Sequence, residues 1–122
     1  MTHLRVHDGA MESEFEQLLR VRRDEVRDQL AHFDADLAQI RAGRSAADGD
    51  DEHDPEGSTL SADWSRASGL RTEALSLLDE IDAARQRLVD GTYGTCILCG
   101  QTIPAERLRI RPWAREHVTC PA

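Results

Sequence analysis

Three cysteines and a histidine near the C-terminal end carry the clearest chemical pattern in the sequence. Cys96 and Cys99 have two residues between them, and after seventeen residues His117 and Cys120 repeat that spacing. Thiolate and imidazole ligands suit zinc, and two such pairs are typical of structural zinc sites. Because four protein ligands complete a tetrahedron, no position is left for water or substrate. The pattern predicts one structural zinc ion (Zn2+) and no catalytic metal.

The same residues leave alternatives open. Glu116, a water molecule or His53 of another molecule can replace His117 as the fourth ligand, and the cysteines can instead be free thiols buried in a small core. A disulfide framework is disfavoured because the number of cysteines is odd. Gly100, directly after Cys99, fits a tight turn whose backbone N–H groups point at the sulfurs.

Apolar residues recur every seven positions in two segments that precede the cysteines, residues 11–42 and 60–90. The rows are Leu19, Val26, Phe33, Ile40, Leu30 and Leu37, then Leu60, Ala67, Ala74, Ile81, Leu88, Trp64 and Leu78. This repeat predicts a mainly α protein, an antiparallel two-helix coiled-coil hairpin with arms of roughly 45 to 50 Å, capped by a small zinc-ribbon-like finger. Arg23, Arg71 and Arg85 interrupt the rows, and the stem of Arg23 can lie along the seam with its guanidinium in solvent.

The connection between the two segments, residues 43–59, is strongly acidic. Its carboxylates are Asp48, Asp50, Asp51, Glu52, Asp54 and Glu56, against one arginine. We expect this acidic tip, residues 50–56, to bind a partner; the alternative is a solvated linker, which most runs of like charge are. The expected organisation is a flexible N-terminus (1–10), the hairpin (11–90) and the zinc finger (91–122).

Composition narrows the function classes. The net charge of −8 and the pI near 5.0 argue against wrapping nucleic acid, and 4% aromatic residues argue against a deep catalytic pocket. No nucleophile and base fall at motif spacing, so we expect no enzyme. No apolar run is long enough to cross a bilayer, and the first residues lack the apolar core of a signal peptide. We therefore expect a cytoplasmic monomer that binds a protein and neither a membrane nor specific DNA.

The C-terminal motifs resemble those of the DksA/TraR family of bacterial zinc-finger proteins. They are Gly91-Thr-Tyr-Gly-x-Cys96-x-x-Cys99-Gly-x-x-Ile103-Pro-x-x-Arg107-Leu108, then Pro112-x-Ala114, then the ligand positions 117 and 120. The resemblance implies a regulator of transcription initiation that binds RNA polymerase directly, without touching promoter DNA. Its coiled coil would enter the secondary channel and bring acidic residues near the catalytic magnesium, where Asp51 and Asp54 match the family's paired tip aspartates.

Three departures from the family pattern stand out. His117 occupies a position that is usually cysteine, and Glu56 occupies that of an alanine after the paired aspartates, in a longer and more acidic connection. The chain ends at Ala122, where many relatives continue into a helix that anchors them on the polymerase, so we expect anchoring that is weaker or comes from elsewhere. The rival hypothesis is a zinc-capped hairpin that binds another protein or self-associates. Trp113 is either a partner anchor or packs on the finger.

Overall fold

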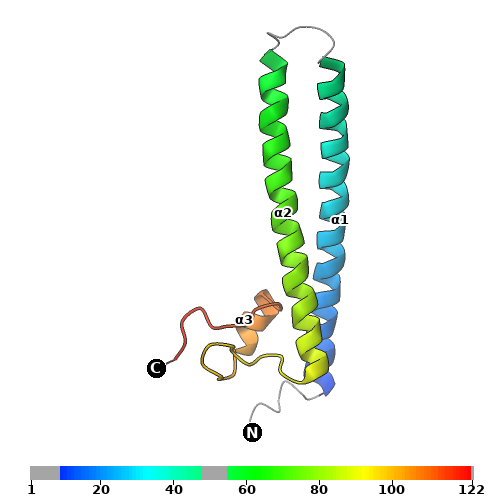
Figure 1. Ribbon diagram of the computed structural model, residues 1–122. Coiled ribbons are helices and arrows are strands. Elements are labelled where there is room, and N and C mark those ends of the chain that lie inside the picture. Colours follow the sequence, from blue (N-terminus) through cyan, green and yellow to red (C-terminus); the bar gives the residue numbers. More distant parts are fainter. Residues whose placement is uncertain (1–8, 48–54, 122) are drawn as a thin grey trace. The chain divides into compact units, whose positions relative to one another are not determined.

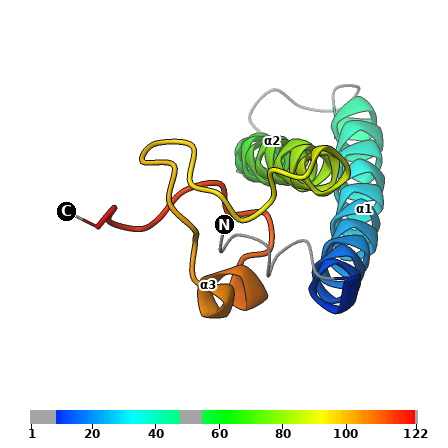
Figure 2. The ribbon, with the colours of Figure 1, turned by 90° about the horizontal axis from the view of Figure 1, so that it is seen from below.

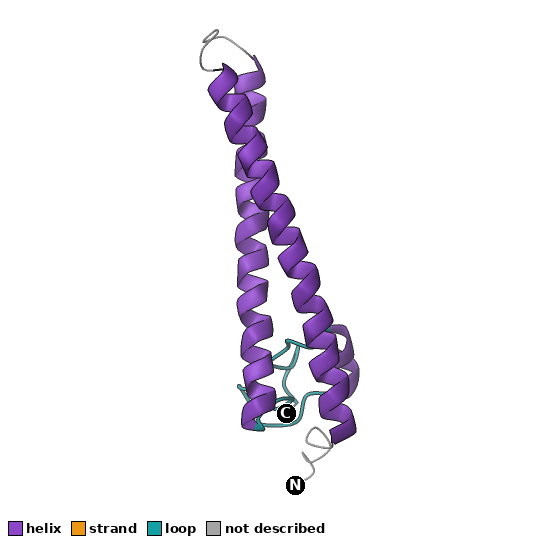
Figure 3. Ribbon diagram, turned by 90° about the vertical axis from the view of Figure 1, so that its right-hand side faces the viewer, coloured by secondary structure: helices purple, strands orange, loops and turns teal. Residues whose placement is uncertain are grey.

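The computed structural model describes residues 9–47 and 55–121. Three helices occupy this part of the chain: α1 (Gly9–Ala47), α2 (Pro55–Asp90) and α3 (Ala105–Ile110) (Figure 1). The described residues contain no β-strand, only one isolated bridge between Thr95 and Thr102 (Figure 3). The predicted mainly α fold is therefore confirmed. The chain divides into two compact units, Met1–Asp24 with Leu78–Ala122, and Glu25–Leu77.

Both long helices extend further than their heptad rows predicted. Helix α1 continues through Gly43 and ends at Ala47. A side chain at position 43 would point at Leu60 of α2. Helix α2 begins at Pro55, whose fixed φ suits the first helical position. Glu56 belongs to this first turn, whereas the predicted tip residues Asp50, Asp51, Glu52 and Asp54 lie outside the described residues.

In the unit Glu25–Leu77 the two helices run antiparallel and side by side (Figures 1 and 3). Arg71 of α2 donates to Asp34 of α1 at 2.6 Å, and the guanidinium of Arg41 lies 5.4 Å from the ring centroid of Trp64. Val26, Ala67 and Ala74 are buried, while the larger seam residues are half-buried. No helix in the described ranges is both long enough and apolar enough to span a membrane.

The other unit packs the start of α1 and the end of α2 with the finger, and Figure 2 views these segments from below. Leu19 and Ile81 of the predicted seam are fully buried. Phe15 and Ala84 are equally buried although neither belongs to a heptad row. The ring of Phe15 lies 5.4 Å from that of Tyr93, so the finger covers part of α1 that a two-helix seam would leave exposed.

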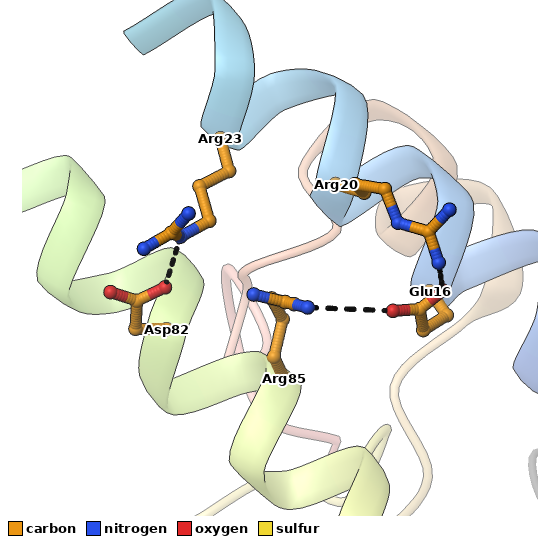
Figure 4. A network of polar contacts seen from close by, with 5 residues as sticks. All are labelled: Glu16, Arg20, Arg23, Asp82 and Arg85. Carbon is orange, nitrogen blue, oxygen red and sulfur yellow. Dashed lines mark hydrogen bonds and ion pairs between the residues drawn. The ribbon is translucent and has the colours of Figure 1, made fainter. Parts of the chain in front are cut away.

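The arginines that interrupt the heptad rows pair with carboxylates of the opposite helix. In the first unit Arg23 donates to Asp82 at 2.8 Å, and Arg85 lies 3.6 Å from Glu16, which also accepts from Arg20 (Figure 4). Because these groups are partly exposed, each pair is worth at most about 1 kcal/mol. The apolar rows therefore hold the helices together, and the arginines cost little where they interrupt them.

Candidate metal centre

The chain leaves α2 through a glycine-ended turn that starts the finger. Gly91 has a φ of 81°, and the N–H of Thr92 donates to the carbonyl of Arg87 at 2.9 Å, which caps α2. Tyr93, which follows this turn in the chain, is buried. Its hydroxyl donates to the carbonyl of Pro112 at 2.7 Å. Burial raises the pKa of Tyr93 well above its usual range, so the hydroxyl remains a donor.

The first ligand pair sits in a tight loop, which we call the first knuckle (residues 96–99). The N–H of Gly100 donates to the carbonyl of Cys96 at 2.9 Å, and the φ of 76° at Gly100 is the left-handed conformation expected from the sequence. The N–H of Leu98 points at the sulfur of Cys96 at 3.4 Å. These backbone contacts fix the position of Cys96 in the loop.

Helix α3 positions the second knuckle (residues 117–120). Leu108 of α3 is buried, and Arg107 donates from Nε to the carbonyl of Glu116 at 3.0 Å. The N–H of Ile97 donates to the carbonyl of Arg115 at 2.9 Å, which joins the first knuckle to the segment before the second. These bonds bring the two ligand pairs close together, although seventeen residues separate the pairs in the sequence.

All four predicted ligands meet in one cluster. The candidate ligand atoms of Cys96, Cys99, His117 and Cys120 lie within 4.8 Å of one another. The sulfurs of Cys96 and Cys120 are 3.7 Å apart, and the sulfur of Cys99 is 3.4 Å from Nδ1 of His117. Glu116 is not part of the cluster, and His53 lies outside the described residues.

The spacing and chemistry of the donors fit a tetrahedral zinc ion. With Zn–S near 2.3 Å and Zn–N near 2.0 to 2.1 Å, tetrahedral geometry requires S···S and S···N separations of about 3.8 and 3.6 Å. Nε2 of His117 donates to the carbonyl of Thr102 at 3.0 Å, which leaves the lone pair of Nδ1 for the metal. The cluster is compatible with one structural zinc ion, as the sequence predicted.

The charges of the thiols also favour a bound cation. Burial alone would raise the pKa of Cys96, but the backbone N–H groups of Cys99, His117 and Leu98 and the His117 side chain lower it to about 6. Burial and the sulfurs of Cys96 and Cys99 raise the pKa of Cys120 to about 12. A bound dication would stabilise the thiolate forms of all three cysteines, whose negative charges would otherwise repel one another.

Several residues around the finger make contacts that the sequence left open or did not predict. Trp113 is half-buried, and the guanidiniums of Arg22 of α1 and Arg111 of the finger lie 5.8 and 5.5 Å from its ring, so it packs within the unit that contains both. Arg109 donates to Glu14 of α1 at 2.7 Å, a contact that no motif predicts. Thr102 supports His117 through its carbonyl, which the sequence could not reveal because any residue type supplies that group.

Comparisons with known proteins agree with this site. Residues 91–115 match the prokaryotic dksA/traR C4-type zinc finger. General stress protein 16O of Bacillus subtilis (strain 168) is 38% identical over 76 residues, which cover 62% of this chain and 47% of that protein. An uncharacterized protein of Aquifex aeolicus (strain VF5) is 41% identical over 51 residues, 42% of this chain and 35% of that protein. The chain thus spans less than half the length of these curated relatives.

A solved structure has the same fold. Transcription factor DksA2 from Pseudomonas aeruginosa is 25% identical to this chain and superposes with a TM-score of 0.77 over 91% of this chain and 80% of that one. Residues 91–115 thus resemble the DksA/TraR zinc finger, and the cluster holds His117 together with three cysteines where the C4 type has four cysteines. The predicted resemblance is confirmed.

Proposed function

We propose that this chain is a non-enzymatic transcription factor that binds bacterial RNA polymerase directly in the cytoplasm. The observation that carries the proposal is the likeness to the transcription factor DksA2, which extends over 91% of the chain and so includes the helices as well as the finger. The family finger at residues 91–115 supports the same role. A fold alone does not define a function, and the matching finger supplies the second, site-level argument.

Within this proposal, Cys96, Cys99, His117 and Cys120 hold one zinc ion that stabilises the finger. The hairpin of residues 11–90 enters the secondary channel, and the acidic tip, Asp50, Asp51, Glu52, Asp54 and Glu56, modulates initiation there. Carboxylates act strongly near a metal ion and cationic groups in a poorly solvated channel. The chain acts as a monomer and makes no sequence-specific contact with DNA, in keeping with its net charge of −8.

A binding experiment tests the proposal. The purified zinc-loaded chain is titrated against core RNA polymerase, with a labelled DksA-family protein as competitor. We expect saturable binding and mutual displacement, because both proteins would occupy the same channel. No binding, together with self-association in sedimentation, would instead support the zinc-capped hairpin that mediates other protein contacts.

A further inference from the structure

Two side-chain contacts join α1 to α2 in the unit Glu25–Leu77, and both have the same offset between the helices. Nε of Arg71 donates to Asp34 at 2.6 Å, and the guanidinium of Arg41 lies 5.4 Å from the ring centroid of Trp64. Arg41 lies seven residues after Asp34 on α1, and Trp64 lies seven residues before Arg71 on α2. All four residues line one groove between the helices, so the two contacts belong to a single antiparallel register.

A third contact, in the other unit, has the same offset. Arg23 donates to Asp82 at 2.8 Å (Figure 4). Arg23 lies eleven residues before Asp34 on α1, and Asp82 lies eleven residues after Arg71 on α2. Seven and eleven residues are about two and three helical turns, so the contacting positions share one side of each helix. Polar and cationic contacts thus repeat along both helices in one register.

The apolar rows by themselves do not determine that register. They repeat every seven residues, so they meet again after a slip of one heptad. Among the described residues of α2 in the unit Glu25–Leu77, Ala67 and Ala74 are the buried ones, and a slip would exchange one alanine for the other. The contact of Phe15 with Tyr93 belongs to the other unit. This part of the hairpin therefore needs register-specific contacts of its own.

The charged residues distinguish the registers. Arg27 and Arg41 lie one heptad before and one heptad after Asp34 on α1. A slip of one heptad in either direction therefore places Arg71 opposite an arginine and removes Asp34 from its partner. Exposed ion pairs add little to stability, but polar groups at seam positions can select one register among those that the apolar rows allow. The arginine that interrupts the second heptad row of α2 thus disfavours both neighbouring registers.

We propose that Asp34, Arg41, Trp64 and Arg71, the hairpin clamp, are positioning residues that set where the acidic connection is presented. Helix α1 ends at Ala47 and α2 begins at Pro55, so the register of the helices fixes the two points between which the connection runs. A slip of one heptad displaces one helix along the other by about 10 Å. Electrostatic effects fall with distance, so such a displacement would weaken the action of the carboxylates. This inference rests on the proposed function and adds residues that act through the connection.

The register can be tested without polymerase, because the chain contains no lysine. Arg71→Lys introduces a single side-chain amine, and a zero-length carbodiimide joins it to a carboxylate in contact with it. No carboxylate lies three or four residues from position 71 on α2, so a cross-link within the helix does not compete. We expect mass spectrometry of the digested monomer to locate the cross-link at Asp34. Cross-linking mainly at another carboxylate, such as Asp28, or none at Asp34, would overturn the inference.

The positioning role is tested by exchanging the charges of the pair. Arg71→Asp and Asp34→Arg are each compared with the double variant that carries both changes. Arg20→Asp is the matched control, because Arg20 pairs with Glu16 inside α1 and cannot affect the offset between the helices. Trp64→Leu keeps an apolar side chain and removes the ring beside Arg41, so it tests the second contact of the clamp.

Two measurements are made on each protein: amide hydrogen exchange, and single-round transcription at equal occupancy of the polymerase. We expect each single charge variant to exchange about tenfold faster in residues 25–47 and 59–77, with the finger unchanged, because the two helices separate more readily there. The single charge variants should also lose most of the effect on initiation, and Trp64→Leu should lose part of it. The double variant and the control should resemble the parent in both measurements.

The outcomes separate this inference from the proposed function. If the double variant is as impaired as the single variants, or if Arg20→Asp is equally impaired, the pair has no positioning role. The inference is then overturned, while the proposed function stands on the binding of the parent. If the parent itself does not bind polymerase, the proposed function fails and the positioning role fails with it, whereas the cross-link still decides the register.

Discussion

Substitutions at His117 test how closely the metal cluster resembles the four-cysteine form of the finger. Its Nδ1 lies 3.4 Å from the sulfur of Cys99, and its Nε2 is held by the carbonyl of Thr102. We expect His117→Cys to retain one zinc per chain, because cysteine gives the four-cysteine ligand set. His117→Ala leaves only three protein ligands and should lose zinc at lower chelator concentrations. Competition with a coloured chelator ranks the three proteins. Equal retention by the alanine variant would show that another group is the fourth ligand.

Tyr93 provides a pH-dependent prediction at the same scale. Its buried hydroxyl donates to Pro112, and burial raises its pKa in the folded protein. Tyrosine in an unfolded chain has a pKa of about 10, so the contribution of Tyr93 to stability is complete below that pH and is lost as the pH rises towards the folded pKa. We expect Tyr93→Phe to cost about 1 to 3 kcal/mol at pH 8, because the buried carbonyl loses its donor.

The measurement is denaturant unfolding of the zinc-loaded proteins at pH 8 and 10.5. The difference between parent and Tyr93→Phe should be smaller at pH 10.5, because only the parent loses the tyrosine contribution there. The comparison removes effects of alkaline pH that both proteins share, such as those on the thiols and the metal. A constant difference at the two pH values would contradict the assigned role of the hydroxyl.

At the scale of the elements, the helices could be predicted from the sequence because the apolar repeat is regular. Val26, Ala67 and Ile81 occupy the predicted rows and are buried. The apolar repeat ends before the helices do, because a heptad pattern marks only the packed seam. Helix α1 continues to Ala47, and helix α2 begins at Pro55. The four cysteine and histidine positions were equally predictable, since ligand type and spacing are themselves the signal.

The contacts of the finger with the helices in its unit could not be predicted. Phe15 is fully buried and meets Tyr93, yet it lies off the heptad rows, so no periodicity marks it. Glu14 looks like any surface carboxylate until Arg109 of α3 is placed beside it. Such contacts depend on where the finger folds back onto α1, which is a tertiary property. Local patterns in a single sequence do not contain it.

Gly69 gives a prediction about helix α2. It lies in the helix interior, is exposed, and has no atom within 4 Å of where a Cβ would be. We expect Gly69→Ala to stabilise the protein by about 0.5 to 1 kcal/mol, because alanine loses less backbone entropy on folding. Gly100→Ala is the contrasting variant, since a φ of 76° is strained for alanine and should cost about 1 to 2 kcal/mol in the finger.

Thermal unfolding followed by circular dichroism measures the first variant, and zinc retention measures the second. The two glycines belong to different compact units, so their effects should add when the variants are combined. A Gly69→Ala protein that melts at a lower temperature than the parent would indicate that position 69 makes a contact which the alanine methyl disturbs.

At the scale of the whole molecule, the proposed function assigns separate tasks to separate parts of the chain. The finger and the helix surfaces supply binding area, whereas the acidic connection supplies charge. The chain concentrates carboxylates in that connection: Asp48, Asp50, Asp51, Glu52, Asp54 and Glu56 lie within nine consecutive residues. Affinity for the polymerase and effect on initiation should therefore be separable by substitution.

Replacing Asp51 and Asp54 with asparagine should leave affinity for RNA polymerase largely intact and remove any change in initiation. Asparagine keeps the shape of aspartate and removes its charge, so the substitution isolates the electrostatic contribution. Because the neighbouring carboxylates can compensate, a connection with all six acids neutralised is the necessary companion variant. Single-round transcription from a promoter with an unstable open complex is measured beside competition binding. If the fully neutralised chain binds and still alters initiation as the parent does, the connection is a solvated linker, and the action on initiation must come from the helices or the finger.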